Sequence, residues 1–155
     1  MYLEELIPGI NIEDNKNEFK RILEEGKSED SGKSKEIGWL KTFAAFANTE
    51  GGTIFVGVDN KTHTIISMDH ETADKVVLMI HRQIKQRLEP AISYSIESLP
   101  IKNNEQTRYV LKICIEKSQI LPVTLHEDNL LGIYVRNYGN SVLATPEQIR
   151  DLVLL

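Results

Sequence analysis

The sequence predicts a single α+β domain built around a mixed β-sheet. Three observations support this fold class. Strand-like and helix-like patterns follow one another as strand, helix, strand, helix, several strands and a last helix. The run TIFVGV at 53–58 is almost entirely apolar, which is typical of a central strand covered on both faces. The length of 155 residues suits one domain with its own core.

The first half of the chain is predicted to alternate two strands with two amphipathic helices. In NEFKRI, alternation with a period of two turns Phe19 inward and places Glu18 and Lys20 together on the opposite face. A glycine pair that begins at Gly51 supplies the left-handed C-cap of the first helix, and Pro90 stops the second. The expected elements are a strand at 17–22, a helix at 35–50, a strand at 53–58, a turn at 59–61 and a helix at 71–89.

The second half is predicted to be rich in strands. ISYSIESL and RYVLKICIE alternate apolar and polar residues, and the turn-rich IKNNEQ joins them. VTLHEDNLLGIYVRN is expected to form two more short strands around a tight turn. Thr145 and Pro146 then suit the N-cap and first position of a last helix. Because the apolar face of this helix has only just begun at the end of the sequence, we expect residues 1–155 to be the N-terminal module of a longer protein with further C-terminal domains.

The composition is that of a soluble globular protein, with 41% apolar and 26% charged residues. A lone cysteine, Cys114, excludes a disulfide framework and a cysteine-rich zinc site. The sequence shows no signal peptide, and no stretch approaches the roughly twenty apolar residues of a membrane span. We therefore expect a cytoplasmic protein that does not insert into a membrane.

The segment EGKSEDSGKSKE, at 25–36, contains GKS twice and invites comparison with a phosphate-binding loop. That loop has four residues between its first glycine and GK, whereas five residues separate Gly26 from Gly32. The preceding residues are charged rather than strand-like, and Glu29 and Asp30 would repel a triphosphate. The sequence thus predicts a mobile, solvated loop at 26–35 that binds no nucleotide.

The charge pattern neither requires nor excludes a nucleic-acid ligand. The net charge is −5, which is not typical of a dedicated nucleic-acid-binding protein. Residues 16–41 nevertheless hold seven lysines and arginines among six acids. Further along, YVRNYGNS places Arg136 near a tight turn with Tyr134 and Tyr138 close by. This combination suits phosphate contact with aromatic stacking, although a simply solvated arginine fits the pattern as well.

Asp59 follows the apolar strand directly, at the edge of the sheet where open α/β folds bind ligands, although aspartate also begins turns. Together with other segments it resembles the AlbA-type domain of the Schlafen group, which is also described as a divergent AAA domain in bacterial proteins. The resemblance extends from about Glu13 to Leu152. The matching segments are EFK at 18–20, AFANTEGG at 45–52, GVD at 57–59, the Pro122-Val123 pair and YVRNYGNS at 134–141.

The resemblance implies nucleic-acid binding, as in prokaryotic transcriptional regulators that carry this domain ahead of other modules. Some Schlafen proteins are metal-dependent endoribonucleases that cut structured RNA such as tRNA. Their acidic trio corresponds here to Glu13, Glu18 and Asp59, which could hold Mg²⁺ or Mn²⁺. Two departures from the family pattern weaken that correspondence. Asp14 stands where the family commonly has serine, and the loop at 26–35 lengthens the stretch after Glu18.

Three functional hypotheses follow. The first is a nucleic-acid-binding module that contacts DNA or RNA through Lys16, Lys20, Lys41 and Arg136. The second is a nuclease that uses the acidic trio; the alternative for that trio is an exposed Glu18–Lys20 ladder and a solvated Glu13. ATP binding is a third hypothesis, which follows only from the divergent AAA description and fits a sequence without a Walker-type loop poorly.

A homodimer is a further expectation. Eukaryotic Schlafen cores resemble two AlbA-like lobes that face each other across a basic valley, whereas this chain carries one lobe. A symmetric pair would double the cations along one groove.

Overall fold

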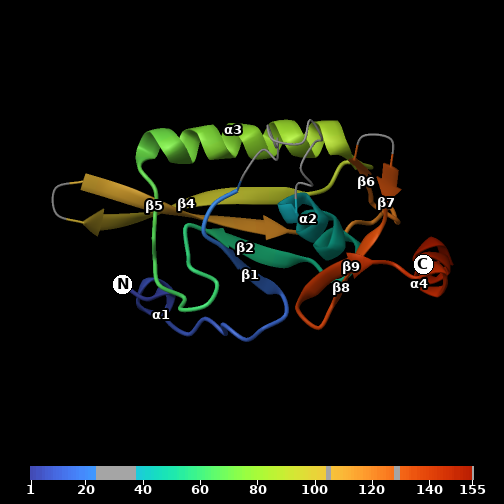
Figure 1. Cartoon of the computed structure of the whole chain (residues 1–155), viewed down its shortest axis with the longest axis horizontal. Coiled ribbons are helices and arrows are strands. Elements are labelled where there is room, and N and C mark those ends of the chain that lie inside the picture. The colour runs from blue at the N-terminus through green and yellow to red at the C-terminus, as the bar shows by residue number, and fades with distance from the viewer. Residues whose placement is uncertain (24–37, 104–105, 128–129, 155) are drawn as a thin grey trace, which may run out of the picture.

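The centre of the protein is a four-stranded mixed sheet, seen in a computed structural model that describes residues 1–23, 38–103, 106–127 and 130–154. The strand order is β1-β2-β5-β4 (Figure 1). β1 and β2 are parallel, whereas β2–β5 and β5–β4 are antiparallel. The strand bounds are Asn17–Lys20 for β1, Gly52–Val56 for β2, Tyr94–Asn103 for β4 and Gln106–Ile115 for β5. The predicted α+β class and mixed sheet are confirmed.

Helices and smaller sheets surround this centre. In the described part of the chain there are three longer helices, as expected, and one of four residues. The helices are α1 (Leu3–Leu6), α2 (Gly38–Asn48), α3 (His70–Arg87) and α4 (Pro146–Leu154). A three-stranded sheet consists of β3 (Leu88–Glu89), β6 (Thr124–Glu127) and β7 (Leu130–Gly132), and a hairpin consists of β8 (Tyr134–Asn137) and β9 (Asn140–Leu143). None of the helices in the described residues is long and apolar enough to cross a membrane.

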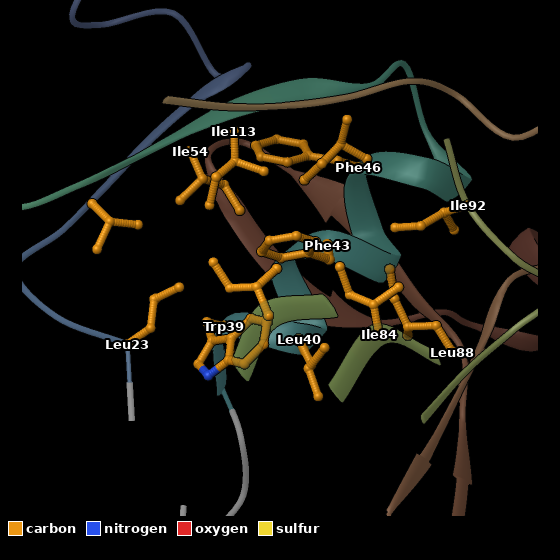
Figure 2. Close-up of a cluster of buried hydrophobic side chains, with 14 of the residues drawn as sticks. Leu23, Trp39, Leu40, Phe43, Phe46, Ile54, Ile84, Leu88, Ile92 and Ile113 are labelled. Carbon is orange, nitrogen blue, oxygen red and sulfur yellow. The ribbon is translucent and has the colours of Figure 1, made fainter. Parts of the chain in front are cut away.

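Two hydrophobic clusters occupy opposite faces of the sheet, and β2 contributes to both. Ile54 and Val56 belong to the larger cluster, in which Figure 2 shows the aromatic side chains of α2. Phe55 belongs to the other cluster, where its ring stacks on that of Phe19 at 5.6 Å between centroids. This placement explains the almost continuous apolar run in β2 and confirms that Phe19 points inward.

The predicted helix caps at Gly51 and Thr145 are also confirmed. Gly51 follows α2 with φ of +77°, and its N–H donates to the carbonyl of Phe46 at 2.8 Å. A Cβ at Gly51 would lie 2.7 Å from the carbonyl oxygen of Ile115, so this position requires glycine. At α4, the N–H of Gln148 donates to Thr145 Oγ1 at 3.1 Å and the N–H of Thr145 donates to Gln148 Oε1 at 2.9 Å. This reciprocal pair is a capping box.

The structure differs from the predicted elements in four places. The helix predicted at 71–89 ends at Arg87, and its last two residues form β3. β4 and β5 extend into the segment expected to be a turn, so their connection is shorter than IKNNEQ. The segment 123–137 forms three strands rather than two, because β8 pairs with the unexpected strand β9 instead of with β7. α1 was also not predicted, although Leu3 in it is fully buried. The predicted loop at 26–35 lies outside the described residues.

A buried side-chain amide fixes the end of α2 against two later segments. Asn48 is 2% exposed, and its Nδ2 donates to the carbonyls of Val123 and Tyr134, both at 2.9 Å. Its Oδ1 accepts the N–H of Val123 at 2.7 Å. The amide therefore satisfies backbone groups that would otherwise be buried without partners, and it holds β8 beside α2.

We expect Asn48→Ala to reduce the free energy of unfolding by about 3 kcal/mol, because three hydrogen bonds are lost and backbone groups remain buried without partners. Asn48→Asp should cost at least as much at neutral pH, since a carboxylate would face two carbonyl oxygens. Urea unfolding measures both changes. Asn60→Ala, at an exposed turn, is the control and should stay within about 0.5 kcal/mol of the wild type. Wild-type stability of Asn48→Asp would contradict the hydrogen-bond assignment.

Candidate nucleic-acid interface

Arg136, on β8, is the point at which β1, α2 and the β8–β9 hairpin meet. Its Nη1 lies 2.8 Å from Glu18 Oε2 and donates to Ser141 Oγ at 3.0 Å, while Nε donates to the carbonyl of Asn15 at 3.3 Å. The guanidinium also lies over the ring of Phe46, with Cζ 4.7 Å from the ring centroid. Its side chain is only 7% exposed. The polar atoms of the Arg136 side chain thus already have partners inside the protein, because β9, a strand that the sequence did not predict, folds back beside it.

Glu18 is the anionic partner of Arg136 in this ion pair. It lies on β1 opposite Ile54 of β2, on the face predicted for it, and its side chain is 21% exposed. Ser141 extends the network by donating to Thr42 Oγ1 at 3.1 Å, and Thr42 itself is 3% exposed. The carboxylate of Glu18 therefore joins strand β1 to the hairpin through a largely buried ion pair.

The three predicted lysines lie on the elements that surround Arg136. Lys16 is 54% exposed, and its Nζ is 3.4 Å from Glu50 Oε2 just beyond α2. Lys20, on β1, is partly buried. Lys41, on α2, has its Nζ 5.4 Å from the centroid of the Tyr134 ring. Two of the four predicted cations, Lys16 and Arg136, also line one cavity.

That cavity has a volume of about 330 Å³. It is lined by Asp14, Asn15, Lys16, Phe46, Thr49, Glu50, Gly51, Arg136 and Tyr138. The two tyrosines of the YVRNYGNS segment have opposite environments. Tyr134 is 8% exposed and belongs to the core, whereas Tyr138 is 89% exposed at the tip of the hairpin. Only the exposed one is available for stacking on a ligand.

Asp59 forms a turn after β2. Its Oδ1 accepts the N–H groups of Lys61 and Thr62 at 2.8 and 2.9 Å, and its Oδ2 lies 3.0 Å from Arg21 Nη1. Hydrogen bonds from the Thr62 and Lys61 backbones, with a smaller contribution from the Arg21 charge, lower the pKa of this carboxyl below its ordinary value of 3.8. The turn expected at 59–61 is confirmed.

The predicted acidic trio is not assembled in this arrangement. Across residues 1–23 and 38–154, with the undescribed positions set aside, no three His, Cys, Asp or Glu side chains form a group that could hold a metal ion. Glu18 and Asp59 each pair with an arginine, and Glu13 lies exposed in the segment before β1. The three carboxylates therefore do not fit a shared Mg²⁺ or Mn²⁺ here, and the metal and nuclease roles stay predictions.

Most of the chain matches the sequence model of one protein family. The sequence model described as "Schlafen, AlbA_2" matches residues 13–145. The chain belongs to the Schlafen AlbA_2 family. The matched range of this Schlafen AlbA_2 domain begins at Glu13 and contains every site residue predicted from the sequence.

A solved structure of the DIP2311 protein from Corynebacterium diphtheriae is similar to the domain at 20% sequence identity and a TM-score of 0.49. The similarity covers 84% of this chain but 22% of the DIP2311 chain, so the Schlafen AlbA_2 domain spans less than a quarter of that protein's length.

The Glu18–Arg136 pair predicts strong energetic coupling. Glu18→Gln or Arg136→Met should each cost about 2–3 kcal/mol, because either change leaves a largely buried charge without its partner. The double variant should cost less than the two single changes added together, by about 1–2 kcal/mol. Denaturant unfolding of the four proteins measures this coupling. The exposed Lys75–Glu71 pair on α3 is the control and should couple by no more than about 0.5 kcal/mol. Additive costs at Glu18 and Arg136 would contradict the assigned ion pair.

The lowered pKa of Asp59 predicts a pH-dependent contribution to stability. A carboxyl whose pKa is lower in the folded state stabilises the fold above its unfolded pKa and loses this contribution as the pH falls through the folded value. We expect the stability difference between wild type and Asp59→Asn to be greatest above the ordinary value of 3.8 and to disappear at more acidic pH. Urea unfolding from about pH 6 to about pH 2 measures it. A difference that grows on acidification would contradict the assigned hydrogen bonds.

Proposed function

We propose that this Schlafen AlbA_2 domain binds nucleic acid, as the recognition module of a transcriptional regulator. The observation that carries the proposal is that an exposed cation and an exposed aromatic ring, those of Lys16 and Tyr138, line the same cavity. An ammonium group suits a phosphate, and an exposed ring suits a base. Membership of the Schlafen AlbA_2 family supports the same conclusion.

Lys16 can exchange its protein partner for a phosphate at little cost. The side chains of Lys16 and Glu50 are 54% and 69% exposed, and their nearest charged atoms are 3.4 Å apart. Such exposed pairs stabilise a protein by less than about 1 kcal/mol. A phosphate of the nucleic-acid backbone would therefore compete with Glu50 for the same ammonium group.

Arg136 supports the surface instead of binding a phosphate. Its guanidinium is 7% exposed and already has three polar partners, so the phosphate contacts fall to Lys16, Lys20 and Lys41. With three contacts on a protein of net charge −5, the binding should be of modest affinity and sensitive to salt.

Salt dependence tests this proposal. Three phosphate contacts predict a slope of log affinity against log salt of about −2.7 on duplex DNA and about −2 on a single strand. Lys16→Gln should reduce the magnitude of the duplex slope by about 0.9. Fluorescence anisotropy at several salt concentrations measures these slopes.

The control is Lys75→Gln, because Lys75 is similarly exposed and similarly paired, but lies on α3. Its slope should equal that of the wild type. If neither DNA nor RNA is bound even at low salt, nucleic-acid binding is refuted. If Lys16→Gln and Lys75→Gln behave alike, Lys16 is not a phosphate contact.

A further inference from the structure

We propose that the cavity beside Tyr138 holds one unpaired nucleobase, so that the domain prefers single-stranded nucleic acid, or an unpaired base within a fold, to a continuous duplex. This inference rests on the proposed nucleic-acid binding and specifies its substrate class. It comes from three features of the cavity: the conformation of Tyr138, the size of the hollow with Arg136 in its wall, and the hydrogen-bond acceptors that line it.

Tyr138 is held in a conformation that the local sequence does not favour. β8 and β9 are joined by two residues, Tyr138 and Gly139, with φ of +50° and +80°. Hairpin turns of this kind favour asparagine or aspartate before the glycine, and a tyrosine there is strained. The ring gains little from packing, because it is 89% exposed. Strain without burial is typical of positions retained for binding, and here it presents a flat aromatic ring on a short, paired hairpin.

The hollow beside the ring has the size and the wall that a base requires. Its volume of about 330 Å³ lies near the lower end of the range for small-molecule sites, which suits a group the size of one nucleoside. Arg136 and Phe46 both line the hollow, and the guanidinium carbon lies 4.7 Å from the centroid of the Phe46 ring, which is itself only 1% exposed. Because the contacts of Arg136 with Glu18 and Ser141 hold the guanidinium in place, this wall is organised before a ligand arrives.

The rim of the cavity is rich in hydrogen-bond acceptors. Asp14 and Glu50 contribute carboxylates and Asn15 a side-chain amide, while Lys16 contributes the cation. Adenine, cytosine and guanine carry exocyclic amino groups with two hydrogens to donate to such acceptors, whereas thymine and uracil offer a single N3–H. The cavity should therefore favour bases with an amino group, while Lys16 contacts the adjoining phosphate.

A base inside a regular duplex could not enter this site. Its faces are covered by neighbouring bases and its pairing edge is occupied, so entry requires unstacking and unpairing at a cost of a few kcal/mol per base. A base in a single strand or loop is already available for stacking on an aromatic side chain. The preference for unpaired bases follows from this difference.

The test uses the whole protein and a short DNA strand in which one adenine is replaced by a fluorescent analogue that is quenched by stacking. The same strand annealed to its complement is the duplex probe. The wild type should bind the single strand more tightly and quench the analogue. Tyr138→Phe should behave like the wild type, because the ring is retained. Tyr138→Asn should weaken single-strand binding by about 5- to 150-fold and abolish the quenching, since stacking on one base has that effect.

Two controls make the outcome decisive. Tyr138→Asn places a favoured residue in the turn, so its Tm should be no lower than that of the wild type, and weaker binding could not be attributed to unfolding. Tyr2→Ala removes another exposed aromatic ring, 55% exposed beside α1, and should bind like the wild type. Equal single-strand affinity of Tyr138→Asn and wild type would overturn the base site while leaving nucleic-acid binding intact. Failure of the wild type to bind either probe would overturn both.

Discussion

The buried amide of Asn48 is the interaction on which the placement of the segments at Val123 and Tyr134 beside α2 depends. Two later segments run past the end of α2 inside the protein, and the Asn48 side chain serves their buried backbone groups, the N–H of Val123 and the carbonyls of Val123 and Tyr134. With Tyr134 fixed, the next residues of β8 have a defined position beside α2. Arg136 then reaches Glu18 on β1, and the hairpin tip stands beside the cavity. The candidate interface thus depends on satisfying the buried backbone groups of Val123 and Tyr134.

The sequence predicted the fold better than the site because apolar periodicity is a local signal, whereas ion pairing is not. The alternation around Phe19, the apolar run of β2 and the caps at Gly51 and Thr145 each depend on residues close in the chain, and each is confirmed. β9 was missed because its sequence, NSVL, is short and lies directly after a turn in which a tyrosine replaces the usual asparagine. The burial of Arg136 could not be predicted without β9. The sequence does contain a signal for β9, since Tyr138-Gly139 lies between two segments that can pair as a hairpin.

The two arginine-paired carboxylates have different surroundings, and this difference bears on the nuclease hypothesis. Asp59 uses both oxygens, one for two backbone N–H groups and one for Arg21, so it is committed to its turn. Glu18 is held by one arginine that is almost fully buried. Metal binding by Asp59 would therefore compete with the hydrogen bonds of its turn and with Arg21, whereas metal binding by Glu18 would compete with Arg136.

The ion pair between Glu18 and Arg136 also limits which substitutions these two positions can accept during evolution. The two residues lie 118 positions apart in the chain (136 minus 18), yet loss of either charge leaves the other buried in an unfavourable environment. Substitutions at the two positions should therefore covary across the family. Covariation of this pair would show how widely the family uses the ion pair to join β1 to the hairpin.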